Sequence, residues 1–110
     1  MPRKPRNFTP YARKLCEEMG WVGDLTERWA GGYKIDYLGM FDFLALNTAG
    51  SAMGIQITSN ENVPARVKKM KANPNLAKWL ENGGEAEVWG FGKKNNRILL
   101  LRRVRLEEEK

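Results

Sequence analysis

Three polar side chains stand at strand-like positions within an otherwise apolar stretch, and their chemistry suits a metal ion. Asp42 lies at the start of the apolar run 41–46, whereas Gln56 and Thr58 lie in and just after the run 53–57. Because side chains alternate along a strand, Gln56 and Thr58 point to the same face. A carboxylate, an amide oxygen and a hydroxyl are ligands that suit a hard cation such as Mg²⁺. The three residue types therefore predict a cation site, provided that the two runs pair.

The two runs are predicted to pair as a β-hairpin. Both are short and rich in aromatic or β-branched residues, and the segment 47–51 between them has the composition of a turn. An antiparallel hairpin would bring the polar face of the second strand beside Asp42, at one end of a buried sheet. Asp36, a short distance before the first strand, is a second candidate carboxylate, and an ordinary turn residue is an equal alternative for it.

The composition excludes several kinds of active site. The 110 residues include one cysteine and no histidine. The absence of histidine rules out histidine-activated nucleophiles, histidine-based nucleases and most zinc or copper sites. Cys16 alone cannot form an internal disulfide, and we expect it to be a small core residue. Any catalysis must therefore use carboxylates, lysines, hydroxyls and a metal.

The charge favours a polyanionic partner. A net charge of +6 and an isoelectric point near 9.7 are typical of domains that bind nucleic acid, although many basic domains are merely soluble. Basic residues gather in the segment 1–7, predicted to be a flexible arm, and in the helix that follows the second run. The candidate nucleic-acid-binding residues are Arg3, Lys4, Arg6, Lys34, Arg66, Lys68, Lys69 and Lys71.

The pattern along the chain predicts a helix, three strands, a basic helix broken near Asn73-Pro74, and two more strands. The helix is expected to begin with Thr9 as its N-cap and to end at Gly20, and the strands cover 21–30, 41–46, 53–57, 85–91 and 97–106. This order predicts an α/β (α+β) fold with a mixed central sheet flanked by helices. We expect one domain over 8–106 and an acidic tail over 107–110. No apolar run is long enough to span a membrane and no signal peptide is seen, so we expect a cytoplasmic protein.

This arrangement resembles the PD-(D/E)XK nuclease superfamily, with its restriction-endonuclease-like αβββαβ core. Within it, the chain is most similar to small phage and archaeal Holliday-junction-resolvase-like and VRR-NUC-like proteins. The likeness covers roughly 8–105 and is carried by the segments FDFLAL, GIQIT, NVPARVKKM and EVWGF. On this resemblance Asp42 matches the motif Asp, Gln56 stands at the position of the motif Glu, and Thr58 stands at that of the motif Lys.

The resemblance implies a metal-dependent, structure-selective DNA endonuclease that acts as a homodimer on branched DNA. One Mg²⁺ or Mn²⁺ would lower the pKa of a bound water and neutralise charge on the scissile phosphate. The implied catalytic residues are Asp42, Gln56, Thr58 and Asp36, and the implied metal ligands are Asp42, Gln56 and the main-chain carbonyl of Ile57. Because Gln56 removes a negative charge and Thr58 removes a cation, another lysine would have to replace that cation. The candidates are Lys34, Lys68 and Lys69.

Two other functions stay open at this point. The first is a nucleic-acid-binding module that has kept the nuclease fold without cutting, which the Gln56 and Thr58 substitutions favour and the retention of Asp42 and Asp36 disfavours. The second is a protein-interaction subunit whose tryptophans form an interface. In a domain of this size, tryptophans are more often part of the core. The four are Trp21, Trp29, Trp79 and Trp89.

Overall fold

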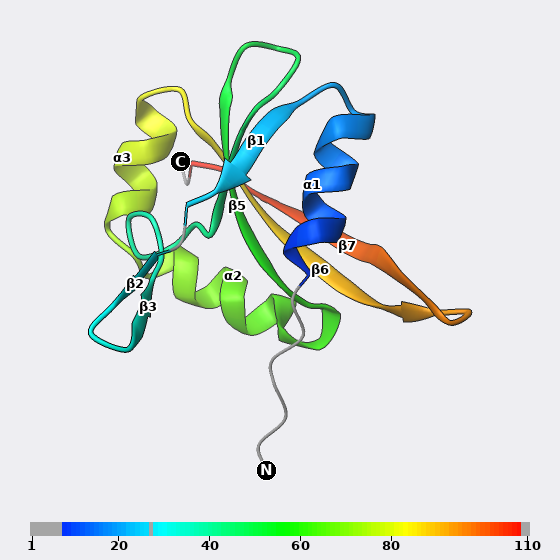
Figure 1. Cartoon of the computed structure of the whole chain (residues 1–110). Coiled ribbons are helices and arrows are strands. Elements are labelled where there is room, and N and C mark those ends of the chain that lie inside the picture. The colour runs from blue at the N-terminus through cyan, green and yellow to red at the C-terminus, as the bar shows by residue number, and fades with distance from the viewer. Residues whose placement is uncertain (1–7, 27, 109–110) are drawn as a thin grey trace.

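A mixed β-sheet with helices packed against it forms the body of the protein (Figure 1). The computed structural model describes residues 8–26 and 28–108, without the side chains of 28–30 and 33–35. In chain order the elements are α1 (Thr9–Glu18), β1 (Val22–Leu25), β2 (Arg28–Ala30), β3 (Tyr33–Ile35), β4 (Phe43–Leu46), β5 (Ala52–Ser59), the 3₁₀ helix η1 (Asn60–Asn62), α2 (Val63–Lys71), α3 (Asn75–Glu81), β6 (Glu85–Lys94) and β7 (Arg97–Leu106). The predicted mixed sheet flanked by helices is confirmed. None of the helices in these described ranges is long and apolar enough to cross a membrane.

The main sheet has five strands in the order β1-β4-β5-β6-β7. All neighbours are antiparallel except β5 and β6, which run parallel. Parallel neighbours need a long crossover, and the broken helix α2–α3 supplies it. The strands β2 and β3 form a separate two-stranded sheet. Without this insertion, the elements α1, β1, β4, β5, α2–α3 and β6 follow the predicted αβββαβ order.

The two faces of the sheet carry two separate cores. Phe43 packs with residues of α1, including Cys16, whereas the next residue, Leu44, packs against the core beneath α2 and α3. This alternation is what a strand buried on both faces requires. Among the tryptophans, Trp89 is fully buried on the α1 face. Burial also raises the pKa of the Cys16 thiol to about 11, so this cysteine is a protonated core residue.

The prediction of a single strand over residues 21–30 is wrong. The pairing of β1 with β4 ends at Leu25 and Phe43, and Thr26 then donates its N–H to the carbonyl of Asp42 at 3.0 Å. Because β4 begins here, a longer β1 would have no partner strand beyond this point. The chain instead leaves the sheet and forms the β2–β3 hairpin.

The start of α1 also differs from the prediction. Phe8, not Thr9, occupies the N-cap position, and no side-chain cap hydrogen bond is formed there. The Phe8 ring stacks on Phe91 with 5.6 Å between ring centroids, so packing against the sheet sets the beginning of the helix. On the same first turn, Tyr11 is 43% exposed, so the buried side of α1 is formed by Ala12 and Cys16.

A tight turn immediately precedes Asp42. The N–H of Tyr37 donates to the carbonyl of Phe41 at 2.7 Å, and between them Leu38 and Gly39 have φ angles of 57° and 74°. Such left-handed angles are uncommon for leucine and need support from the surroundings.

The helix junction α2–α3 gives that support. The Nδ2 atoms of Asn73 and Asn75 donate to the carbonyl of Leu38 at 3.1 and 3.3 Å. On the sheet side, Phe41 lies over Gly54, where an added Cβ would be only 2.5 Å from the ring. The residue before Asp42 is therefore fixed by the glycine beneath it, and the turn is fixed by two asparagines.

Candidate functional site

Asp42 and Gln56 meet on neighbouring strands at the point where β4 begins. Phe43 pairs with Ile55 across β4 and β5, and the N–H of Asp42 donates to the carbonyl of Ile55 at 3.1 Å. Asp42 therefore lies opposite Gln56, whose Nε2 donates to Asp42 Oδ2 at 3.0 Å. Both residues are buried, at 3% and 5% exposure. The contact that the sequence predicts between these two side chains is present.

The main chain of β5 orients the Asp42 carboxylate. The N–H of Ile57 donates a hydrogen bond to Asp42 Oδ1 at 2.9 Å, and Asp42 Oδ2 accepts the hydrogen bond from the Gln56 amide. Charge-assisted hydrogen bonds of this kind offset part of the cost of burying a carboxylate. Two adjacent residues of one strand thus determine the direction in which Asp42 can offer an oxygen to a ligand.

Thr58 lies on the same sheet face as Gln56, two residues nearer the carboxyl end of β5. It is 6% exposed and pairs with Gly90 in the parallel strand β6. An added Cβ at Gly90 would lie 2.4 Å from Cγ2 of Val63, so the start of α2 packs directly over this part of the sheet. Thr58 is therefore enclosed beneath the helix, and it brings no charge to the site.

The donor atoms fit a hard divalent cation in kind and spacing, with one negative charge. On octahedral Mg²⁺, two neighbouring oxygens about 2.1 Å from the metal are about 3.0 Å apart. The terminal amide atom of Gln56 is 3.0 Å from Asp42 Oδ2, and rotating the amide by half a turn exchanges its nitrogen for its oxygen. The pair can therefore form a hydrogen bond or share a metal ion. Within residues 8–26 and 28–108, no group of three or more cysteine or acidic side chains could hold a metal.

Of the other two residues proposed for the metal site, Ile57 contacts Asp42 through its backbone, and Asp36 makes a backbone contact within the preceding turn. Asp36 is half-buried in the turn between β3 and β4, where its carbonyl accepts the N–H of Gly39 at 3.0 Å. Ile57 contacts Asp42 through its N–H. A metal contact by the Asp36 carboxylate or by the Ile57 carbonyl stays a prediction.

The basic residues of α2 lie toward solvent. Val63 and Met70 are buried and mark the inward side of the helix. At helical spacing Lys68 and Lys69 project from the opposite side, so neither is placed to supply the cation missing beside Asp42. Their exposure suits contact with phosphates instead. The exposed lysines of α2 are Lys68, Lys69 and Lys71, and Arg66 is half-buried. The side chains of Arg3, Lys4, Arg6 and Lys34 lie outside the described residues.

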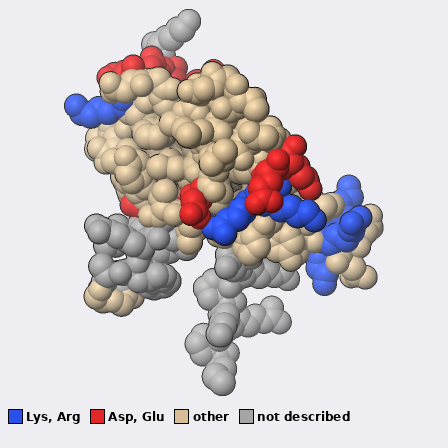
Figure 2. All heavy atoms as spheres, turned by 45° about the horizontal axis from the view of Figure 1, so that its top comes forward, with Lys and Arg blue, Asp and Glu red and all other residues tan. Residues whose placement is uncertain are grey.

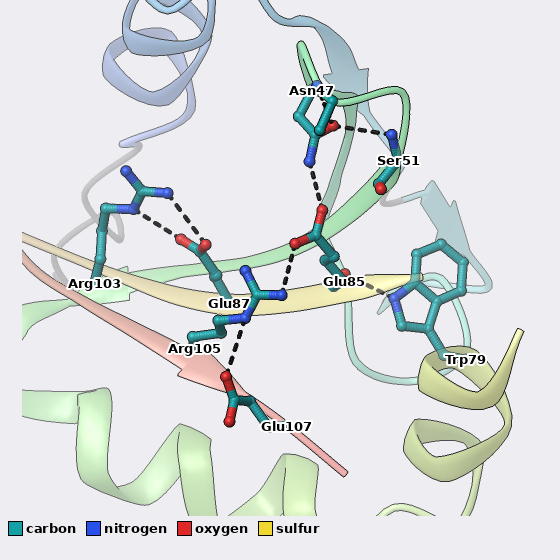
Figure 3. Close-up of polar contacts among 9 residues, drawn as sticks. Asn47, Ser51, Trp79, Glu85, Glu87, Arg103, Arg105 and Glu107 are labelled. Atoms are coloured by element: carbon teal, nitrogen blue, oxygen red, sulfur yellow. Dashed lines mark hydrogen bonds and ion pairs between the residues drawn. The ribbon is translucent and has the colours of Figure 1, made fainter. Parts of the chain in front are cut away.

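A second polar cluster, on the α1 face, was not predicted from the sequence (Figure 3). Glu87 is 5% exposed and accepts hydrogen bonds from Arg103 Nε at 2.7 Å, Arg103 Nη2 at 3.1 Å and Trp89 Nε1 at 2.8 Å. The Arg103 guanidinium also lies over the rings of Trp21 and Trp89, 5.6 and 5.3 Å from their centroids. The sequence signal was the pair of alternating acids in β6 opposite alternating arginines in β7.

Glu85 extends this cluster to the amino end of β6. It accepts hydrogen bonds from Asn47 Nδ2 at 2.5 Å and forms an ion pair with Arg105 at 2.7 Å, as Figure 3 shows. Burial opposes ionisation, but the hydrogen bonds from Asn47, Arg105 and Ser51 outweigh it and lower the pKa of Glu85 below its ordinary value. Both acids are satisfied by protein donors, so this cluster stabilises the end of the sheet away from Asp42.

Comparison of the chain with protein-family models, with curated proteins and with solved structures finds no match.

Proposed function

We propose that this protein is a metal-dependent DNA endonuclease that hydrolyses phosphodiesters and prefers branched DNA. The observation that carries the proposal is the buried Asp42 carboxylate, oriented by Ile57 and 3.0 Å from the Gln56 amide. A buried acid facing an amide oxygen donor at a strand end is the kind of site that holds a hard cation. The basic character of the chain supports a polyanionic substrate.

Asp42 and Gln56 would hold the Mg²⁺ or Mn²⁺, with the Ile57 carbonyl or Asp36 as a further ligand. When bound, such a metal supplies an activated water and neutralises charge on the phosphate. Ile57 keeps the carboxylate in position through its N–H, and Gln56 would offer its amide oxygen to the metal. Because Asp42 brings one negative charge, we expect weak metal affinity until the phosphates of DNA supply more.

The second candidate is a nucleic-acid-binding module that does not cut. Two observations favour it: both Asp42 oxygens already accept hydrogen bonds within the protein, and Thr58 carries no cation for the site. In that case the hydrogen-bonded pair would only stabilise the strand end, and the basic surfaces would bind phosphates with little reading of sequence.

The experiment that separates the two is incubation of the protein with branched and linear DNA in the presence of Mg²⁺ or Mn²⁺. Wild type is compared with Asp42→Ala and with the control Glu61→Gln, an exposed acid in η1. We expect Asp42→Ala to lose cleavage and keep binding, and the control to keep both. Binding without metal-dependent cutting by the wild type on every substrate would establish the second candidate instead.

A further inference from the structure

The end of the β6–β7 hairpin projects beyond the rest of the sheet. The last pair between β5 and β6 is Ser59 with Phe91, so residues 92–94 and 97–99 pair only with each other. Asn95 and Asn96 have φ angles of 52° and 60° and close the hairpin with a tight two-residue turn. We term residues 92–99 the ribbon. In Figure 1 it extends away from the helices, at the orange end of the hairpin.

The ribbon carries positive charge that its own structure does not compensate. Lys93, Lys94 and Arg97 are all exposed, and residues 92–99 contain no acid. Lys94 and Arg97 are direct cross-strand partners. Like charges in this position destabilise a β-ribbon. Among the described residues, none of these three cations takes part in an ion pair.

Farther along β7, two arginines form ion pairs with acids of β6. Arg103 pairs with Glu87 and Arg105 pairs with Glu85, each at 2.7 Å. The same strand therefore neutralises two of its arginines within the sheet. Arg97 on the ribbon and Arg102, both exposed, form no ion pair among the described residues. Figure 2 shows basic side chains gathered on the side of the molecule toward which the hairpin extends. A local violation of the pairing rule without compensation is typical of a functional surface.

We propose that the ribbon contacts the backbone of double-stranded DNA by entering one of its grooves, an inference that rests on the proposed function. A two-stranded β-ribbon is narrow enough for the major groove of B-form DNA. Cations on both of its strands then reach phosphates, and such contacts position the protein without reading the sequence.

The ribbon is also well placed relative to the candidate site. It begins just after Phe91, and Gly90 pairs with Thr58 at the carboxyl end of β5. The ribbon and the site thus lie at the same end of the sheet. A duplex held by the ribbon is thereby brought to the end of the sheet at which Asp42 lies.

The test is binding of fluorescent duplex and branched DNA over a range of salt concentrations, without metal so that cleavage does not interfere. The double variant Lys94→Gln/Arg97→Gln is compared with wild type and with Lys14→Gln/Lys78→Gln. The control removes the same charge from exposed positions of α1 and α3. Each phosphate contact contributes about 0.9 to the slope of log K against log salt concentration. With two contacts removed, the ribbon variant should therefore lose about 2 in this slope and at least about tenfold in affinity. Its melting temperature should equal or exceed that of wild type, because the like-charge pair is gone.

The outcomes are distinguishable. Equal losses in the ribbon variant and the control would show that only net charge matters and would overturn the inference. The inference would also be overturned if the ribbon variant bound DNA as tightly as wild type does. A change of oligomeric state in that variant would assign the ribbon to a contact between copies of the protein instead. If wild type binds none of the DNA, the proposed function itself fails.

Discussion

Replacing Gln56 by glutamate adds a second carboxylate to the site and has a cost that the geometry predicts. Gln56→Glu removes the hydrogen bond to Asp42 and places two carboxylates about 3.0 Å apart, where both are buried. At an effective dielectric constant of about 20, two charges at this distance repel by about 5–6 kcal/mol. The pair can escape by keeping one proton, which from an ordinary glutamate pKa of about 4.3 costs about 3–4 kcal/mol at pH 7. The retained proton forms a hydrogen bond between the two carboxyls in place of the lost one, so we expect a loss of about 3–4 kcal/mol in the free energy of unfolding.

The assay is urea denaturation of Gln56→Glu at several pH values, with and without Mg²⁺ or Mn²⁺. Repulsion raises the pKa of the introduced carboxyl in the folded state, so its cost should shrink as pH falls from 7 toward 5. A divalent metal bound between the two carboxylates should restore stability by linkage. The control, Gln56→Met, removes only the hydrogen bond and should lose about 1–2 kcal/mol with no rescue by acid or metal. If both variants unfold at the same urea concentration under all conditions, residue 56 and Asp42 do not share a site.

Three further predictions concern the fold. Arg103→Ala removes two of the three hydrogen bonds that the buried Glu87 accepts and should cost about 2–3 kcal/mol. Arg105→Ala should cost about 1 kcal/mol or less, because its partner Glu85 is more exposed. Urea denaturation measures both costs, and equal costs would contradict the cluster. Because the pKa of Cys16 is raised, its contribution to stability is retained below pH 9 and falls by about 2–3 kcal/mol as pH rises from 9 toward 11. Cys16→Ala should lack this fall. Unfolding of both proteins at pH 8 and pH 10 is the measurement. Gly54→Ala should destabilise the protein by about 1–3 kcal/mol, because the added Cβ would lie 2.5 Å from the ring of Phe41. Thermal unfolding tests this, and an unchanged melting temperature would contradict the close approach.

The fold class could be predicted because most elements agree with their local patterns. The helix before Gly20 and the break at Asn73-Pro74 both appear in the structure. The hairpin β2–β3 could not be predicted, because it depends on where β4 begins and so on a partner far along the chain. The prediction that Thr9 caps α1 failed for a related reason. Stacking of Phe8 on a strand of the sheet outweighs the preference of threonine for the N-cap position.

The candidate site was predicted in part. Alternation along β5 placed Gln56 and Thr58 on one face, and hairpin pairing then placed Asp42 opposite Gln56. The N–H of Ile57 as a second donor to Asp42 could not be foreseen, since a main-chain contact leaves no mark on residue type. The basic composition of the ribbon can be read from the sequence, but its separation from β5 depends on strand register.

The decisive measurement is the rate of cleavage of branched DNA as a function of Mg²⁺ or Mn²⁺ concentration, for wild type, Asp42→Asn and the control Glu61→Gln. We predict that the wild-type and control rates rise with metal and saturate, and that Asp42→Asn stays at the level of DNA without protein while still binding the substrate. Cleavage by Asp42→Asn at the wild-type rate would show that the buried carboxylate beside Gln56 is not the site of hydrolysis.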